Sequence, residues 1–122
     1  MNEKEANRLR LLNPVFAERI LERQAIGETG RSRIQQVALM INIFLCQMQN
    51  VPATKRHLSN ITDLDIDTLH RRLNSLIQGG FITIRSFLRV VNAASNASVD
   101  QYFISDEYIL HDKDLRQPYC AV

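Results

Sequence analysis

The side chains with the clearest chemistry lie in one stretch, DLDIDTLHRRLNSLIQGGFITI, at residues 63–84. Its apolar residues recur at three- and four-residue steps, which is the spacing of an amphipathic helix. Side chains off this apolar face can donate hydrogen bonds to bases or phosphates, and they are His70, Arg71, Arg72 and Asn74. An arginine can bind guanine O6 and N7 with two parallel hydrogen bonds, and an asparagine can bind adenine in the same way. The stretch therefore predicts an exposed polar helix face. Whether this face contacts DNA, another protein or only water is the question that the rest of the sequence bears on.

Two aspartates at the start of this helix bear on that choice. Asp65 is the expected N-cap, and Asp67 lies in the first turn. A carboxylate at a helix N-terminus stabilises the helix but repels phosphate. It can instead accept a hydrogen bond from cytosine N4. The charges at the start of the helix thus leave both DNA and protein partners open.

The charge distribution favours a polyanionic partner for the middle of the chain. Residues 30–92 carry eight Lys or Arg and three Asp or Glu, whereas residues 1–29 carry five of each. Residues 93–122 carry two basic and five acidic residues, so the net charge is only +2. A basic segment between neutral and acidic ones suits nucleic acid.

The composition predicts a single folded domain without catalytic machinery. The chain has 122 residues, of which 45% are hydrophobic and 23% charged, typical of a globular protein. The start of the chain lacks the apolar core of a signal peptide, and the run VALMINIFLC at 37–46 is too short to span a bilayer. We therefore expect a cytoplasmic protein without a membrane partner. No catalytic motif or metal-ligand spacing appears, and we expect no enzyme activity, metal or cofactor.

Two helices are predicted in the first half of the chain, after a weakly helical start. Asn13-Pro14 favours the start of a helix over Val15–Ile26, which Gly27 would end. Ser32 with Gln35 resembles a capping box for a helix over Ile34–Met48. This second helix is apolar nearly all round, so we expect it to be central and buried on two sides. Our predicted dimer seam combines the two helices and comprises Phe16, Ile20, Leu39 and Ile43.

The second half predicts a short helix, a longer helix and a hairpin. Thr54 is the expected N-cap of the short helix, with Leu58 and Ile61 inward. The longer helix buries a face made of Ile66, Leu69, Leu73 and Leu76. Gly79-Gly80 ends it, and strands 81–91 and 99–105 follow around a turn at 92–98. A last helix would run from Ser105 to Leu115. The fold class is mainly α with a small antiparallel β-hairpin, that is α+β.

Residues 52–84, PATKRHLSNITDLDIDTLHRRLNSLIQGGFITI, resemble the central segment of the MarR-like bacterial transcriptional regulators. The resemblance is carried by Leu64-Asp65, Thr68-Leu69-His70-Arg71, the pair Leu73 and Leu76, and Gly80-Phe81-Ile82. It covers about half of the chain closely. It implies a winged helix-turn-helix fold, here with an extra N-terminal helix.

The resemblance also implies double-stranded DNA as the partner of a homodimer. The third helix, about 66–78, would enter the major groove, and the wing, about 81–105, would touch the adjacent backbone. The residues expected to read bases are Asp67, Thr68, His70, Arg71 and Asn74. Those expected to contact phosphates or the duplex flank are Lys55, Arg56, Arg72, Arg85 and Arg89.

We therefore predict a cytoplasmic, bacterial-type transcriptional regulator that represses by occupying its operator. Its parts would be an N-terminal extension (1–29), a winged helix-turn-helix domain (30–115) and a tail (116–122). A plasmid partition or replication adaptor, which binds repeated DNA sites and a second protein, is one alternative. A winged-helix protein-interaction module that no longer binds DNA is another. Asp65, Asp67 and a wing tip without Lys or Arg favour the last.

Overall fold

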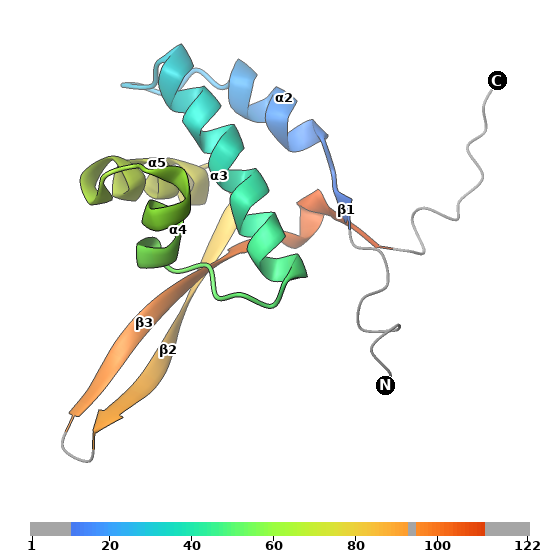
Figure 1. Ribbon diagram of the computed structural model, residues 1–122. Coiled ribbons are helices and arrows are strands. Elements are labelled where there is room, and N and C mark those ends of the chain that lie inside the picture. The colour runs from blue at the N-terminus through green and yellow to red at the C-terminus, as the bar shows by residue number, and fades with distance from the viewer. Residues whose placement is uncertain (1–10, 93–94, 112–122) are drawn as a thin grey trace.

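The computed structural model describes residues 11–92 and 95–111, and within these ranges it describes every side chain except those at 89–97. The described residues form, in chain order, β1 (Leu11–Leu12), α2 (Val15–Glu22), α3 (Gly30–Met48), α4 (Lys55–Thr62), α5 (Ile66–Gln78), β2 (Ile82–Asn92), β3 (Ser95–Ile104), a 3₁₀ turn (Asp106–Tyr108) and β4 (Ile109–Leu110) (Figure 1). This mixture of helices with a small antiparallel hairpin agrees with the predicted α+β class.

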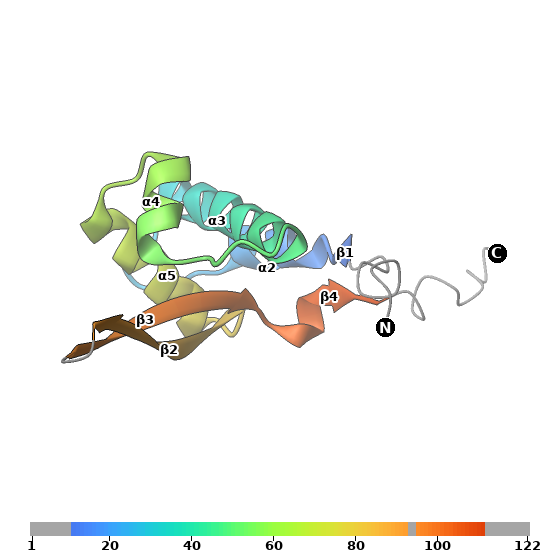
Figure 2. The same cartoon turned by 60° about the horizontal axis from the view of Figure 1, so that its bottom comes forward.

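Helix α3 is the centre of the fold, as its nearly uniform apolar sequence predicted. It buries Leu39, Met40, Ile43 and Cys46. Helix α2 packs along one side of it, α4 and α5 pack on another, and β3 contacts its end (Figures 1 and 2). These elements share one hydrophobic core. Although α3 is long, no helix in the described ranges has the length and apolar content needed to cross a membrane.

The first helix is shorter than predicted. It begins as expected, because the Asn13 Oδ1 accepts a hydrogen bond from the Val15 N–H at 3.1 Å. It ends at Glu22 and not at Ile26, since Arg23 adopts an extended backbone with φ −66° and ψ 128°. Extension there lets the Arg23 side chain reach α5, so a long-range contact overrides local helix propensity.

Helix α3 begins earlier than predicted, with a different capping box. The Thr29 Oγ1 accepts a hydrogen bond from the Ser32 N–H at 3.1 Å, and the Ser32 Oγ accepts one from the Thr29 N–H at 2.9 Å. The reciprocal pair satisfies two N–H groups that the first turn leaves without helical partners. The predicted pair of Ser32 with Gln35 is therefore wrong. The Gln35 side chain instead accepts a hydrogen bond from Arg72.

Helices α4 and α5 have the predicted N-caps. The Thr54 Oγ1 accepts a hydrogen bond from the His57 N–H, and Asp65 is the N-cap of α5. The prediction that Ile61 and Ile66 point inward is wrong, since 45% and 52% of their surfaces are exposed. They flank the turn between the two helices, where Leu64 packs against the core in their place.

A left-handed turn connects α5 to the hairpin. Gly80 has φ +77°, and the Phe81 N–H donates to the Leu76 carbonyl at 2.9 Å, which closes the helix end as the Gly-Gly sequence predicted. The turn puts Phe81 and Ile82 into the core. The Phe81 ring then stacks on Tyr108 with 5.3 Å between centroids.

The hairpin is longer than predicted and leaves the body of the protein (Figure 1). β2 and β3 pair from Ile82 with Ile104 to Asn92 with Ser95, so the expected turn at 92–98 is wrong for residues 95–98. Alternating burial holds only at the base. Ile82 and Ile104 are buried, whereas Leu88, beyond the helices, is 80% exposed.

The C-terminal part differs from the prediction of a helix over 105–115. After one 3₁₀ turn, Ile109 and Leu110 form a strand that pairs with Leu11 and Leu12. Because β1 and β4 lie near opposite ends of the chain, their pairing leaves no local sequence signal. At residues 11–12 the strand β1 takes the place of the weakly helical start that we expected. Residues 1–10 and 112–122, which include the predicted tail, lie outside the described residues.

We predict that Gly80→Ala destabilises the fold by about 1 kcal/mol, because a Cβ is disfavoured at positive φ. Urea denaturation measures the change. Gly30→Ala is the matched control. A Cβ there meets only Arg33 Nη2, at 3.9 Å, so stability should stay unchanged or rise by up to about 1 kcal/mol. Equal losses in the two variants would contradict the role of the turn.

Candidate nucleic-acid interface

The outer face of α5 carries a connected row of polar side chains. Lys55 Nζ lies 2.9 Å from His70 Nδ1, and Asn74 Nδ2 lies 3.1 Å from His70 Nε2. A lysine ammonium can only donate, so Nδ1 accepts and the proton of a neutral His70 lies on Nε2. An Nε2–H needs an acceptor, so the Asn74 amide completes the row when it is turned to present its Oδ1 to the ring. The row joins the first residue of α4 to the middle of α5, and its contacts are exposed. Three predicted site residues thus lie together.

Arg71 and Thr68 adjoin this row at the start of α5. Arg71 Nη2 donates a hydrogen bond to Thr68 Oγ1 at 3.4 Å, a long contact that leaves the guanidinium exposed. The Thr68 hydroxyl, and less strongly its N–H and the Arg71 charge, hold the pKa of the Asp65 carboxyl below its ordinary value. A capping hydrogen bond of full geometry is not formed. Asp67 is also exposed near them. The N-terminal part of this face therefore carries negative charge from the aspartates and positive charge from Arg71.

Arg72 lies on a different side of α5 from the row. It stands about 200° around the helix axis from His70. Its Nε donates to Gln35 Oε1 on α3 at 2.7 Å. Burial, together with the positive charges of Arg71 and Arg31, lowers the pKa of Arg72. The structure thus makes Arg72 a packing contact between α5 and α3, and the sequence offered no signal for Gln35 as its partner.

Two further groups of predicted residues surround the hairpin. Lys55 and Arg56 lie at the start of α4, and with Thr54 they line a groove of about 380 Å³ whose other side is β3 residues 98–100. On the hairpin itself, the Arg85 guanidinium of β2 lies 5.2 Å from the centroid of the Phe103 ring of β3. Arg89 is in β2, but its side chain lies outside what the structure describes.

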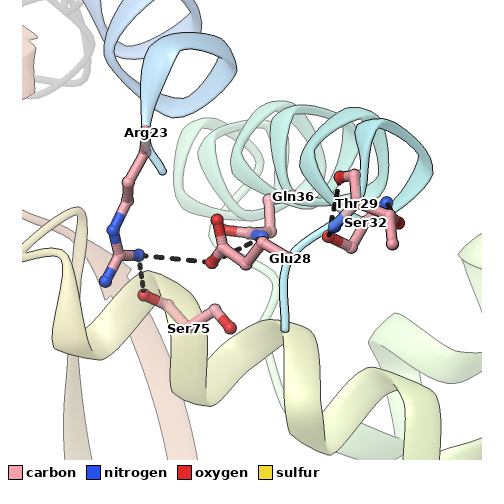
Figure 3. A network of polar contacts seen from close by, with 6 residues as sticks. All are labelled: Arg23, Glu28, Thr29, Ser32, Gln36 and Ser75. Atoms are coloured by element: carbon pink, nitrogen blue, oxygen red, sulfur yellow. Dashed lines mark hydrogen bonds and ion pairs between the residues drawn. The ribbon is translucent and has the colours of Figure 1, made fainter. Parts of the chain in front are cut away.

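A partly buried polar network that sequence reasoning missed holds α5 in place (Figure 3). Arg23 Nη1 donates to the Ser75 carbonyl of α5 at 2.8 Å and lies 3.6 Å from Glu28 Oε1. Gln36 Nε2 on α3 donates to the same Glu28 oxygen at 3.3 Å. Only 7% of the Glu28 side chain is exposed. These contacts tie α2, the linker and α3 to the helix that carries the polar row.

The predicted dimer seam is wrong in its residues. Phe16, Ile20, Leu39 and Ile43 are between 0 and 5% exposed within a single chain. They fill the core between α2 and α3, so a second copy cannot reach them without opening the fold. Periodicity identified these side chains as apolar but could not tell which apolar stripe would be covered from within.

The described residues offer little for other chemistry. Among them no group of three or more His, Cys, Asp or Glu residues is placed to hold a metal ion. Cys46 is buried, and this burial raises the pKa of its thiol, which disfavours the reactive thiolate. The polar face of α5 therefore remains the surface with the most evident binding chemistry.

Comparison with known proteins adds no relative: no protein-family model, curated protein or solved structure matches the chain.

We predict that Arg23→Ala destabilises the protein by roughly 3 kcal/mol, because it leaves the buried Glu28 carboxylate without its cation. Thermal or urea unfolding measures the loss. Arg19→Ala is the control: it removes a long, more than half-exposed ion pair with Glu107, at 3.8 Å, and a hydrogen bond to the Tyr108 hydroxyl, at 3.1 Å, but it leaves no buried charge without a partner. A loss in Arg23→Ala no larger than that in Arg19→Ala would show that the network does not hold α5.

We predict that Thr68→Val raises the pKa of Asp65 toward its ordinary value of about 3.9. An acid titration of the Asp65 carboxyl carbon by NMR checks the shift. A depressed folded-state pKa stabilises the protein above the unfolded-state pKa, and this gain is lost as the pH falls through the folded-state value. The stability difference between wild type and variant should therefore shrink in acid, and an unchanged titration would contradict the contact.

Proposed function

We propose that the chain binds double-stranded DNA as a winged helix and acts as a homodimeric transcriptional regulator. In this proposal α5 enters the major groove and the β2–β3 hairpin is the wing. The order α3, α4, α5 and hairpin supports it. So does the hydrogen bond from the Tyr102 N–H to the Ala53 carbonyl at 3.0 Å, which seats the segment before α4 beside β3.

The observation that carries the proposal is the polar face of α5. Arg71, His70 and Asn74 are exposed on the outer side of a helix whose inner side is locked into the core by Leu69, Leu73 and Leu76. The major groove is about 12 Å wide and admits such a helix. Arginine and asparagine side chains are the ones that pair bidentately with guanine and adenine. A rigid helix that presents these donors suits base recognition.

Cations next to this helix can position it on the phosphate backbone. Lys55 and Arg56 begin α4, where a helix N-terminus also favours an anion. Arg85 is exposed on the hairpin. Phosphate contacts fix the orientation of a protein on the duplex, whereas base contacts supply specificity. The proposed division assigns orientation to α4 and the hairpin and specificity to α5.

The proposed mechanism is occupancy of an operator. A homodimer presents two copies of α5, and two half-sites about 34 Å apart, one helical turn, match such a pair. Bound there, the dimer excludes polymerase by its volume alone. Repression of this kind requires tight, sequence-selective binding and no chemical step.

A protein-interaction module is the second candidate, and one observation favours it. Exposed Ile61 and Ile66 flank the turn before α5, next to the carboxylates of Asp65 and Asp67. An apolar and acidic surface repels phosphate but suits a partly basic protein. The following experiment separates the two candidates.

We predict that the protein binds a fluorescent random-sequence duplex at about 50 mM salt and much more weakly at about 200 mM salt, since binding releases counterions. Fluorescence anisotropy measures both affinities. Arg71→Ala should weaken binding further at both salt concentrations, because it removes a donor and a cation from the α5 face. Arg19→Ala, which removes the same charge from α2, should leave both affinities unchanged.

No binding at low salt by folded protein would overturn the DNA proposal and leave the protein-interaction candidate. Equal effects of Arg71→Ala and Arg19→Ala would show that general charge, and not the α5 face, attracts the duplex.

A further inference from the structure

The outer face of the β2–β3 hairpin carries two aromatic rings and an arginine. Side chains alternate between the two faces of a strand. Ile82, Tyr102 and Ile104 are buried in the core, so the odd-numbered positions beside them face away from it. We call the six residues of this outer face the hairpin platform, and they are Thr83, Arg85 and Phe87 of β2 and, opposite them, Phe103, Gln101 and Val99 of β3.

The two rings of the platform lie close together but do not stack on each other. The centroids of Phe87 and Phe103 are 6.3 Å apart, and their planes are tilted by 52°. The hairpin extends beyond the helices (Figure 1), and 41% of the surface of Phe87 is exposed. An aromatic ring whose face is free offers a flat apolar surface on which another planar group can stack.

Arg85 adds a cation next to both rings. It precedes Phe87 by two residues in β2, and its guanidinium lies 5.2 Å from the centroid of the Phe103 ring, which is within the range of a cation–π contact. This contact holds the charge against the sheet, while Arg85 itself remains exposed. A guanidinium has five N–H donors and can bind a phosphate with two of them. The platform therefore joins a stacking surface to a phosphate donor.

Negative charge is absent from the platform. The hairpin, residues 82–104, holds one acidic residue, Asp100, and two basic ones, Arg85 and Arg89. Asp100 lies opposite Ser86, on the other face of the hairpin, and its Oδ1 accepts a hydrogen bond from the Ser86 hydroxyl at 2.6 Å. The outer face is therefore positive, which suits an anionic partner.

We propose that the hairpin platform binds single-stranded DNA, with bases stacked on Phe87 and Phe103 and a phosphate held by Arg85. Proteins bind unpaired strands with aromatic rings next to cations, because every base has a flat face. A duplex does not offer these faces, since its bases are stacked on one another. The choice of DNA over RNA rests on the proposed function, whereas the stacking on the platform does not.

The spacing within the platform suits neighbouring groups of one strand. Side chains two residues apart on a β-strand, such as Arg85 and Phe87, lie about 7 Å apart. Successive stacked nucleotides of one strand are separated by about 3.4 Å. A phosphate at Arg85 and a base on Phe87 can therefore belong to the same short stretch of a strand.

The charges around the platform indicate the path of the strand. At the base of the hairpin, Asp106 lines a hollow of about 230 Å³ together with Thr83, and its carboxylate repels a phosphate there. At the edge of β3, Lys55 and Arg56 line the groove against residues 98–100. A strand that crosses the platform from β2 to β3 therefore reaches further cations, whereas one that runs toward the base of the hairpin does not.

Fluorescence anisotropy with a labelled oligothymidine of about 15 nucleotides, at about 50 mM salt, tests the platform. An oligomer of the same length made of abasic sugars has the same phosphates but no bases. Wild type should bind oligothymidine at least about fivefold more tightly, since stacking of one base is worth roughly 5- to 150-fold in affinity. Equal affinities would show that only the phosphates are attracted and would overturn the proposal.

The variant Phe87→Ala identifies the ring that carries the stacking. It should weaken oligothymidine binding by about fivefold or more and leave the binding of the abasic oligomer unchanged. Leu88→Ala is the matched control, because it removes an apolar side chain that is 80% exposed on the other face of the hairpin. Phe87→Ala protein that binds like wild type, or equal losses in the two variants, would overturn the proposal.

A pair of oligomers that differ only in the 2′-hydroxyl, oligouridine and oligodeoxyuridine, tests the choice of DNA. The deoxy oligomer should bind at least as tightly as the ribose form. Tighter binding of oligouridine would overturn the assignment of DNA as the partner.

The two proposals fail separately. Arg71→Ala should leave oligothymidine binding unchanged, because Arg71 lies on α5 and not on the hairpin. A protein that binds oligothymidine through Phe87 but ignores the duplex would keep the platform and lose the regulator. A protein that binds the duplex through Arg71, but binds oligothymidine no better than the abasic oligomer, would do the opposite.

Discussion

The structure depends on the burial of α3. This helix is apolar on nearly every side, so it cannot be stable unless other elements cover it. Helices α2, α4 and α5 and strand β3 all pack against it, and their apolar faces meet in one core. Because α5 commits Leu69, Leu73 and Leu76 to that core, its polar side chains have to face outward. The candidate binding surface is thus a consequence of how α3 is covered.

Apolar burial alone does not set the orientation of α5, because it is non-directional. Directional contacts do so at three places. Gly80 sets the exit of the chain toward the hairpin, Arg72 reaches Gln35 on α3, and Arg23 reaches the Ser75 carbonyl. In each case a backbone conformation or a polar group at the border of the core fixes an angle that packing leaves free. The Arg72 and Arg23 contacts join α5 to parts of the chain far from it in sequence, so the position of the polar face rests on the whole fold.

Local signals explain what the sequence could predict. The limits of α5, its Asp65 N-cap and its Gly-Gly end follow from residues within one helical turn of each feature, and the structure agrees with all three. Three of the errors involve distant partners. The end of α2, the β1–β4 pair and the Arg72 contact each depend on residues more than 30 positions away. The predicted dimer seam is wrong because apolar periodicity shows that a helix face is buried but does not show whether the same chain or a second copy buries it.

The central claim, that the polar face of α5 meets DNA, is tested most directly by amide NMR of the ¹⁵N-labelled protein with a random-sequence duplex at low salt. If this face meets DNA, shifted signals concentrate at Asp67–Asn74, at Lys55 and Arg56, and on the hairpin around Arg85. Shifts that avoid α5, or a spectrum that the duplex leaves unchanged, would contradict DNA binding by this face.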